Sequence, residues 1–106
     1  MSALENNVVE NLVPSEFYLS QNYPNPFREK TIIKFCIAYK TKVRLEVLNS
    51  EGNIIKVLID EEKEAGTYEI EFNSHFGEGR NLTSGVYFYQ LQAGEFKSTK
   101  KMILMK

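Results

Sequence analysis

The side chains that could carry out chemistry in this chain are few. A cysteine nucleophile needs a histidine base, and the chain has one of each, Cys36 and His75. Cys36 lies in the middle of a predicted strand on a largely apolar face, so we expect a small buried hydrophobic side chain and not a nucleophile. No serine–histidine–aspartate spacing, phosphate-binding loop or dinucleotide fingerprint is present. We therefore predict no catalytic residue and no enzyme.

Metal-ligating side chains are also sparse. A lone cysteine excludes a cysteine-based metal cluster, and the acidic run Glu61, Glu62 and Glu64 is typical of a solvated loop. Asn73, Ser74 and His75 with Glu78 could offer oxygens to calcium, which takes about six to eight of them, preferably several carboxylates. Only one carboxylate is available there. We predict no metal, no cofactor and no small-molecule substrate, and leave open only a weak cation site in loop 73–81.

Length and charge narrow the classes of partner. The chain has 106 residues, which suits one domain, and its net charge is −1 with both signs interspersed. This balance provides no basic excess to hold a nucleic acid or an anionic membrane. No apolar run approaches the length of a membrane span, and no signal-peptide pattern stands at Met1.

One stretch, residues 84–94, organises the elements that must position any site. It reads Ser-Gly-Val-Tyr-Phe-Tyr-Gln-Leu-Gln-Ala-Gly, a β-branched and aromatic run between two glycines. Successive side chains of a strand alternate between faces, which puts Val86 and Phe88 on one face and Tyr87, Tyr89 and Leu91 on the other. Both faces are apolar, so we predict a central strand that is covered on both sides.

The remaining chain is rich in alternating segments. Strands are predicted over residues 31–38, 42–47, 54–59, 67–73 and 96–105, with a short first strand at 17–19. Short connections favour antiparallel pairing, and no segment sustains a helical period. The fold class predicted is all-β, an immunoglobulin-like antiparallel β-sandwich of about seven strands over residues 17–106. Residues 1–16 lack a period and read as a linker or flexible tail.

Residues 21–27, Gln-Asn-Tyr-Pro-Asn-Pro-Phe, form a stiff extended segment. Pro24 and Pro26 each disfavour helix at the preceding residue, and either X–Pro bond is expected to be trans more often than cis. Tyr23 and Phe27 flank the prolines and are expected to pin the segment onto a sheet edge.

These stretches, in this order, resemble the C-terminal sorting domains, type A, of the type IX (Por) secretion system. The resemblance rests on residues 19–27, Thr31 and Ile33, and on residues 43–52, 65–68, 84–89, 93–94, 99–102 and 106. Two departures stand out. Phe72-Asn73-Ser74 occupies the place where such domains often have aromatic-Asp-Gly, which weakens any inherited cation site, and Arg28 replaces a frequent asparagine.

The resemblance implies a non-catalytic signal that directs a larger cargo protein across the outer membrane. Its implied partners are a preceding cargo domain, the outer-membrane translocon and a sortase-like protease that cuts within residues 1–16. The implied route is the periplasm in transit, then the cell surface or the medium. We expect partner recognition, through edge pairing of the final strand, at residues of the proline segment and the last two strands: Pro24, Asn25, Pro26, Gly85, Tyr87, Thr99, Lys100, Lys101 and Lys106.

Two other functions remain open at this point. The strand beginning Ser84-Gly85-Val86-Tyr87 is shared with structural immunoglobulin-like modules of the flagellar hook-capping type. A carbohydrate-binding module needs exposed aromatic side chains on one face, and this chain has no tryptophan. The lysines of the last strand also have two interpretations, an address read by a partner or charges that keep an edge strand from aggregating.

Overall fold

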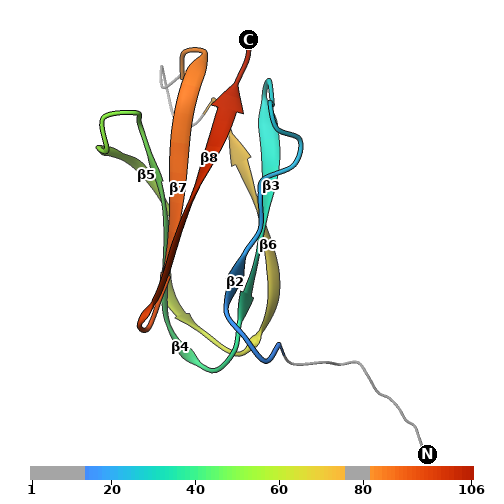
Figure 1. Ribbon diagram of the computed structural model, residues 1–106, viewed down its shortest axis with the longest axis vertical. Helices are drawn as coiled ribbons and strands as arrows, with labels where there is room; N and C mark the ends of the chain where they lie inside the picture. The colour runs from blue at the N-terminus through green and yellow to red at the C-terminus, as the bar shows by residue number, and fades with distance from the viewer. Residues whose placement is uncertain (1–13, 76–81) are drawn as a thin grey trace, which may run out of the picture.

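The structure, a computed structural model, describes residues 14–75 and 82–106. This part of the chain is built of seven strands, as expected for the all-β class (Figure 1). In order they are β2 (Tyr18–Leu19), β3 (Lys30–Ile37), β4 (Thr41–Leu48), β5 (Ile54–Lys63), β6 (Gly66–Asn73), β7 (Gly85–Ala93) and β8 (Phe96–Leu104).

The strands form two layers. One sheet has the order β2-β3-β6 and the other the order β5-β4-β7-β8, and all strand pairs are antiparallel. The predicted immunoglobulin-like sandwich is confirmed, with β7 in the interior of the four-stranded sheet and β8 at its edge. The β7–β8 turn contains Gly94 at φ +60°, a left-handed conformation that favours glycine.

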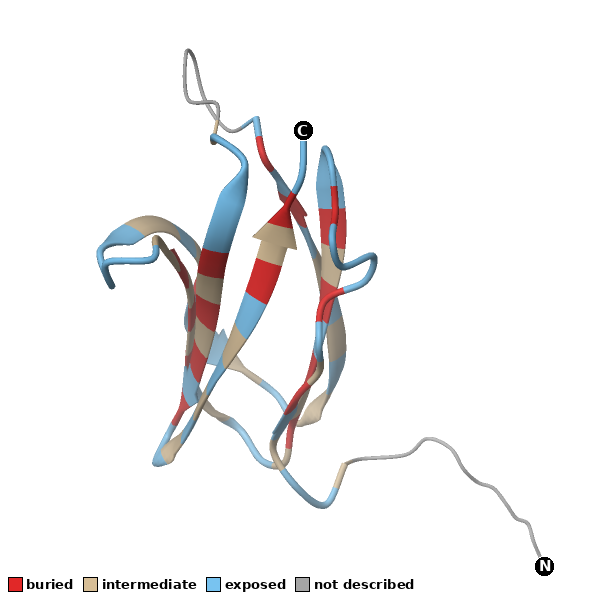
Figure 2. Cartoon of the chain, turned by 45° about the horizontal axis from the view of Figure 1, so that its top comes forward, coloured by how far each residue is buried: buried red, intermediate tan, exposed pale blue. Residues whose placement is uncertain are grey.

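The core lies between the two layers, and buried residues alternate with more exposed ones along β3, β4 and β7 (Figure 2). The largest fully buried side chains come from both sheets and from the proline segment: Leu19, Phe27, Ile33, Phe35, Ile37, Val43, Leu45, Phe72, Tyr89, Leu91, Met102 and Leu104. Burying each such side chain contributes about 1.5–3 kcal/mol to the free energy of folding. The apolar side chains of the alternating segments therefore hold the two layers together.

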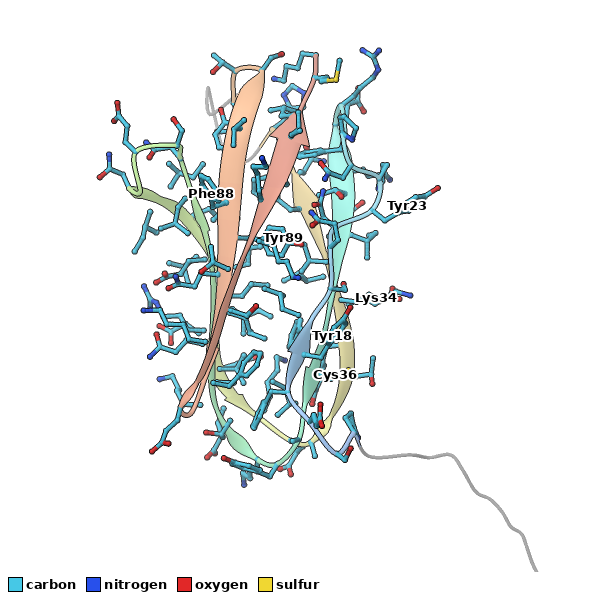
Figure 3. The ribbon with its side chains drawn as sticks, in the orientation of Figure 1. Tyr18, Tyr23, Lys34, Cys36, Phe88 and Tyr89 are labelled. Carbon is cyan, nitrogen blue, oxygen red and sulfur yellow. The ribbon has the colours of Figure 1, made fainter. Side chains whose placement is uncertain are left out.

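The prediction that β7 is covered on both faces is wrong. Tyr89 lies between the sheets, whereas Phe88 points to the outer surface (Figure 3). Val86 is 39% exposed on that same outer face. A two-layer sandwich covers only the inner face of each sheet, so apolar side chains on both faces of a strand do not require a third layer.

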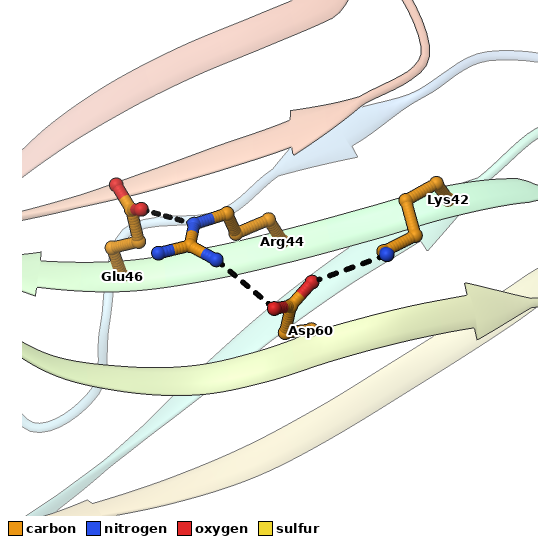
Figure 4. Close-up of polar contacts among 4 residues, drawn as sticks. All are labelled: Lys42, Arg44, Glu46 and Asp60. Carbon is orange, nitrogen blue, oxygen red and sulfur yellow. Dashed lines mark hydrogen bonds and ion pairs between the residues drawn. The ribbon is translucent and has the colours of Figure 1, made fainter.

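The acidic run predicted as a loop is instead part of a strand. Asp60, Glu61 and Glu62 lie in β5, where Asp60 pairs in register with Arg44. Asp60 accepts from Arg44 at 3.0 Å and lies 3.5 Å from the Lys42 ammonium (Figure 4). Cations on β4 opposite the acids offset the repulsion within the run, which allows the strand to continue.

In the part of the chain that the structure describes, no helix is long and apolar enough to cross a bilayer.

Candidate recognition surface

Residues 20–27, here called the clasp, cross from one sheet to the other (Figure 1). At its start the clasp pairs with β3, where the Ser20 amide donates to Lys34 and Tyr23 exchanges both backbone bonds with Ile32 at 2.8–3.0 Å. At its end the Phe27 amide donates to the Ile103 carbonyl at 2.9 Å. The clasp therefore closes one open side of the sandwich.

Phe27 and Tyr23 differ in how they hold the clasp. Phe27 is 1% exposed and meets the Phe72 ring edge-on, with centroids 6.2 Å apart. The Tyr23 side chain is 80% exposed, so its backbone and not its ring attaches the segment. The expectation that both aromatic side chains pin the segment is correct for Phe27 only. Both X–Pro bonds, at Pro24 and Pro26, are cis, the less common isomer that the sequence allowed.

A buried polar network fixes the middle of the clasp. Asn22 is 2% exposed, and its amide nitrogen donates to the Pro24 carbonyl at 3.1 Å and to the Thr31 hydroxyl at 3.0 Å. The Thr31 hydroxyl, fully buried, donates to the same Pro24 carbonyl at 2.8 Å. These bonds satisfy polar groups that would otherwise be costly to bury, and they set the path of the prolines.

Two clasp side chains bond the edge of β8 that does not pair with β7. Asn25 Oδ1 accepts from the Ile103 amide at 2.9 Å, and Gln21 Nε2 donates to the Lys101 carbonyl at 2.6 Å. The Met105 amide also donates to the Phe27 carbonyl at 2.8 Å. The clasp therefore occupies the edge of the final strand from Lys101 onward, so this part of the edge is not available to the partner strand expected from the sequence.

The buried Tyr89 side chain links the clasp to the core by a hydrogen bond. Its hydroxyl donates to the Ser20 carbonyl at 2.6 Å, although the ring is fully buried between the sheets (Figure 3). Burial disfavours the charged phenolate and raises the pKa of Tyr89 to about 12.

The predicted recognition residues of β8 do not share one face. Thr99 and Lys101 point to the outer surface, where Gln90 Nε2 donates to the Thr99 hydroxyl at 2.9 Å. Lys100 is half-buried and alternates with them, on the same side as the buried Met102. Side chains at these three positions can therefore contact a partner only from two directions.

Gly85, Tyr87 and Lys106 lie at the same end of the molecule. Gly85 begins β7 opposite Leu104 and has a φ of +153°, which L side chains rarely adopt. Tyr87 is buried at 8% exposure, and its hydroxyl donates to the Thr83 carbonyl at 2.8 Å. The Lys106 amide donates to the Ser84 hydroxyl at 2.9 Å. Because Leu104 bridges to Phe27 on its other side, Gly85, β8 and the clasp form one continuous row of backbone.

The residues first considered for chemistry lie apart. Cys36 pairs in register with Thr67, whereas Asn73 lies at the other end of the β3–β6 pair, two residues before His75. Cys36 and His75 therefore cannot form a nucleophile–base pair. Cys36 is half-buried with its sulfur 3.7 Å from the Thr67 hydroxyl, and the prediction that it is a buried core residue is wrong. It alternates with the core-facing Phe35 and Ile37 and so faces outward.

The loop considered for a cation is partly described. Among the described residues, no group of three or more histidine, cysteine or acidic side chains could hold a metal ion. Ser74 is buried and bonds the carbonyls of Arg28 and Glu29, while Asn73 Oδ1 accepts from the His75 amide. Glu78 lies outside the described residues.

Two features were missed from the sequence. The first is the Asn22–Thr31 network, for which the only signal is a polar side chain two residues before a proline. The second is an apolar group on the outer face of the four-stranded sheet: Leu48, Ile54, Val57, Val86, Phe88 and Ile103. On the other sheet, Tyr18 lies 55% exposed on the outer surface near Cys36 (Figure 3).

Comparison with known proteins identifies the family of the chain. The chain matches the family described as the secretion system C-terminal sorting domain over residues 21–105. No curated protein matches it.

Solved structures share the fold. One is dimeric latent PorU from Porphyromonas gingivalis, with a TM-score of 0.64 and 18% identity over 94% of this chain. Another is PorZ of the same organism, described as an essential surface component of its type IX secretion system, with a TM-score of 0.57 and 18% identity over 85%. This chain spans about a tenth of either, 10% and 11%. Because the family match covers most of its length, the chain belongs to the C-terminal sorting domains of the type IX secretion system, and it is a sorting signal.

Proposed function

We propose that this domain is a non-catalytic address that the outer-membrane translocon of the type IX system reads in the periplasm. The address belongs to a larger cargo protein, which the domain directs to the cell surface or the medium. The observation that carries this proposal is the joining of the clasp to β8, in which Gln21, Asn25 and Phe27 bond Lys101, Ile103 and Met105.

The physical reason is preorganisation. A flexible tail would lose conformational entropy on binding, whereas the clasp is already fixed by Asn22, Thr31 and Tyr89. Its outer side is still exposed at Pro24, Asn25 and Pro26. The translocon would then recognise a folded surface made of two segments, joined by a bond between residues 78 apart in sequence, and not a linear motif.

We also propose that a sortase-like protease removes the signal by cutting within residues 1–16, with the cargo then attached at the surface or released. Ordered packing supports this boundary. Phe17 stacks on Phe96 with centroids 5.6 Å apart and meets Tyr39 edge-on at 5.0 Å. Ser15 and Glu16, just before it, are exposed. A cut ahead of Phe17 would leave these ring contacts intact. Residues 1–13 lie outside the described residues.

An export assay tests the sorting role. Residues 1–106 are fused behind a fluorescent reporter that carries a periplasmic signal peptide, in cells with and without a working type IX translocon. We expect surface or medium fluorescence only in the competent cells. Reporter held in the periplasm of both strains, with the domain folded by circular dichroism, would contradict the proposal and favour a structural module.

Variants then locate the recognised surface. Truncation after Lys97 removes most of β8 and is expected to block export, but it also removes the buried Met102 and Leu104. Asn25→Ala is the sharper change because it removes one side-chain bond to Ile103. Asn53→Ala, at an exposed asparagine on the β4–β5 turn, is its matched control. Equal export of the two folded variants would exclude Asn25 from the recognised surface.

A further inference from the structure

In the described part of the chain, no strand other than β7 pairs with β8 from Lys97 to Lys101. The backbone amides of Ile103 and Met105 and the carbonyl of Ile103 bond the clasp, so at these two residues the backbone groups point away from β7. Antiparallel pairing alternates this direction residue by residue, so Lys97, Thr99 and Lys101 also point their backbone groups outward. Within residues 14–75 and 82–106, only the Lys101 carbonyl among these groups has a partner beyond β7, the Gln21 side chain.

The open part of β8 is also cationic. Strand β8 carries Lys97, Lys100 and Lys101 and no acid. None of the three lies in an ion pair among the described residues, whereas Lys30, Lys34, Lys40, Lys42, Arg44 and Lys63 all do. The acids of the other long edges, β5 and β6, include Asp60, Glu69 and Glu71, each paired with a cation of its own sheet. Among the described residues, the lysines of β8 therefore carry positive charge that no ion pair compensates.

The inner side of the same edge is aromatic. Phe96 begins β8 and is half-buried, with its ring stacked on Phe17. A strand laid beside Lys97 and Thr99 would turn alternate side chains toward these two rings and the others toward the outer surface, beside the Lys97 and Lys101 ammonium groups.

We propose that the β8 edge from Lys97 to Lys101 takes up an added strand from a partner protein, one that alternates acidic and apolar side chains. The clasp already shows the mode, since it adds backbone to the same edge from Lys101 onward and runs parallel to β8. The partner strand continues that line. This inference rests on the proposed function, because the partner it describes is the component that reads the sorting signal.

A binding experiment with purified residues 1–106 tests the chemistry directly. The probe is a capped ten-residue peptide of alternating glutamate and valine, and the control is the same peptide with lysine for glutamate. We expect the acidic peptide to bind at least about tenfold more tightly, with the preference lost at high salt. Amide hydrogen exchange of Thr99 should slow on binding, while that of Ser98, which faces β7, should not change.

Three variants separate the contribution of charge from that of the backbone. The pair Lys97→Glu and Lys101→Glu should weaken acidic-peptide binding about tenfold, while Lys97→Arg with Lys101→Arg should retain it. Thr99→Pro removes one outward backbone donor and the side-chain bond from Gln90, keeps the backbone bonds between β7 and β8, and should abolish the exchange protection. Failure of both peptides to bind, or equal binding of the two, would overturn the proposal and leave the lysines as charges that only prevent edge-to-edge aggregation.

The export assay distinguishes this inference from the proposed function. If the wild-type fusion is not exported, the sorting role itself fails. If the wild-type fusion is exported and the folded Lys97→Glu, Lys101→Glu variant is exported equally well, the sorting role stands and the edge proposal is wrong.

Discussion

Asn22→Ala should loosen the clasp without disturbing either sheet. The change removes two donated bonds, to Pro24 and to Thr31, in a site only 2% exposed. The change also removes the bond that Asn22 Oδ1 accepts from Gln21 Nε2 at 2.8 Å. Each partner keeps another bond: Thr31 still donates to the Pro24 carbonyl, and the exposed Gln21 still donates to the Lys101 carbonyl, so loss of the Gln21 bond adds little. The cost is about 1 kcal/mol for each of the two donated bonds, about 2 kcal/mol in all.

For a domain of this size, a loss of that order lowers the melting temperature by about 8–16 °C. Urea unfolding measures the free energy, with Thr31→Val and the double variant completing a cycle. The cycle should give a coupling of about 1 kcal/mol, because the two side chains bond each other directly. A loss below about 0.5 kcal/mol for Asn22→Ala, or a coupling near zero, would refute the idea that this network holds the clasp.

Three further predictions each concern a single residue. Tyr89 has a pKa raised from 10.0 to about 12, so stability should be full below pH 10 and fall as the pH rises toward 12; Tyr89→Phe should remove that part of the fall in urea unfolding at alkaline pH. Phe27→Ala should cost about 3–5 kcal/mol of unfolding free energy, because the ring is 1% exposed and packs on Phe72. Gly85→Ala should cost about 1–3 kcal/mol, measured the same way, through its φ of +153° alone, since an added Cβ meets no atom within 4 Å.

Strand positions and the inward faces could be predicted from alternation because burial repeats every second residue. The alternating patterns of β4 and β6 matched their observed bounds within a residue or two. The errors came where a neighbouring strand decided the outcome. Acids of β5 are tolerated because Lys42 and Arg44 lie opposite, and that pairing depends on register, which one strand's sequence does not contain.

For the same reason, the two segments of the candidate recognition surface could be predicted from the sequence, but not the contacts that join them. Proline spacing at Pro24 and Pro26 indicated a stiff extended segment, and the lysines of β8 indicated a charged edge. What joins them is a set of long-range bonds, from Gln21 to Lys101 and from Asn25 to Ile103. A side chain that completes a distant backbone ladder leaves no local periodic signal, so the clasp had to be seen in three dimensions.

The division of β8 into a covered half and an open half gives the signal a physical logic. An edge strand with no cover would pair readily with exposed strands of other proteins, and lysines along it oppose such contacts. Covering the edge from Lys101 onward with the clasp leaves Lys97 and Thr99 as the open backbone positions. So short an edge provides few backbone bonds, and charge must then supply much of the discrimination between partners. Under the edge proposal, the partner strand therefore needs acidic side chains as well as an extended backbone, and loss of either should weaken recognition.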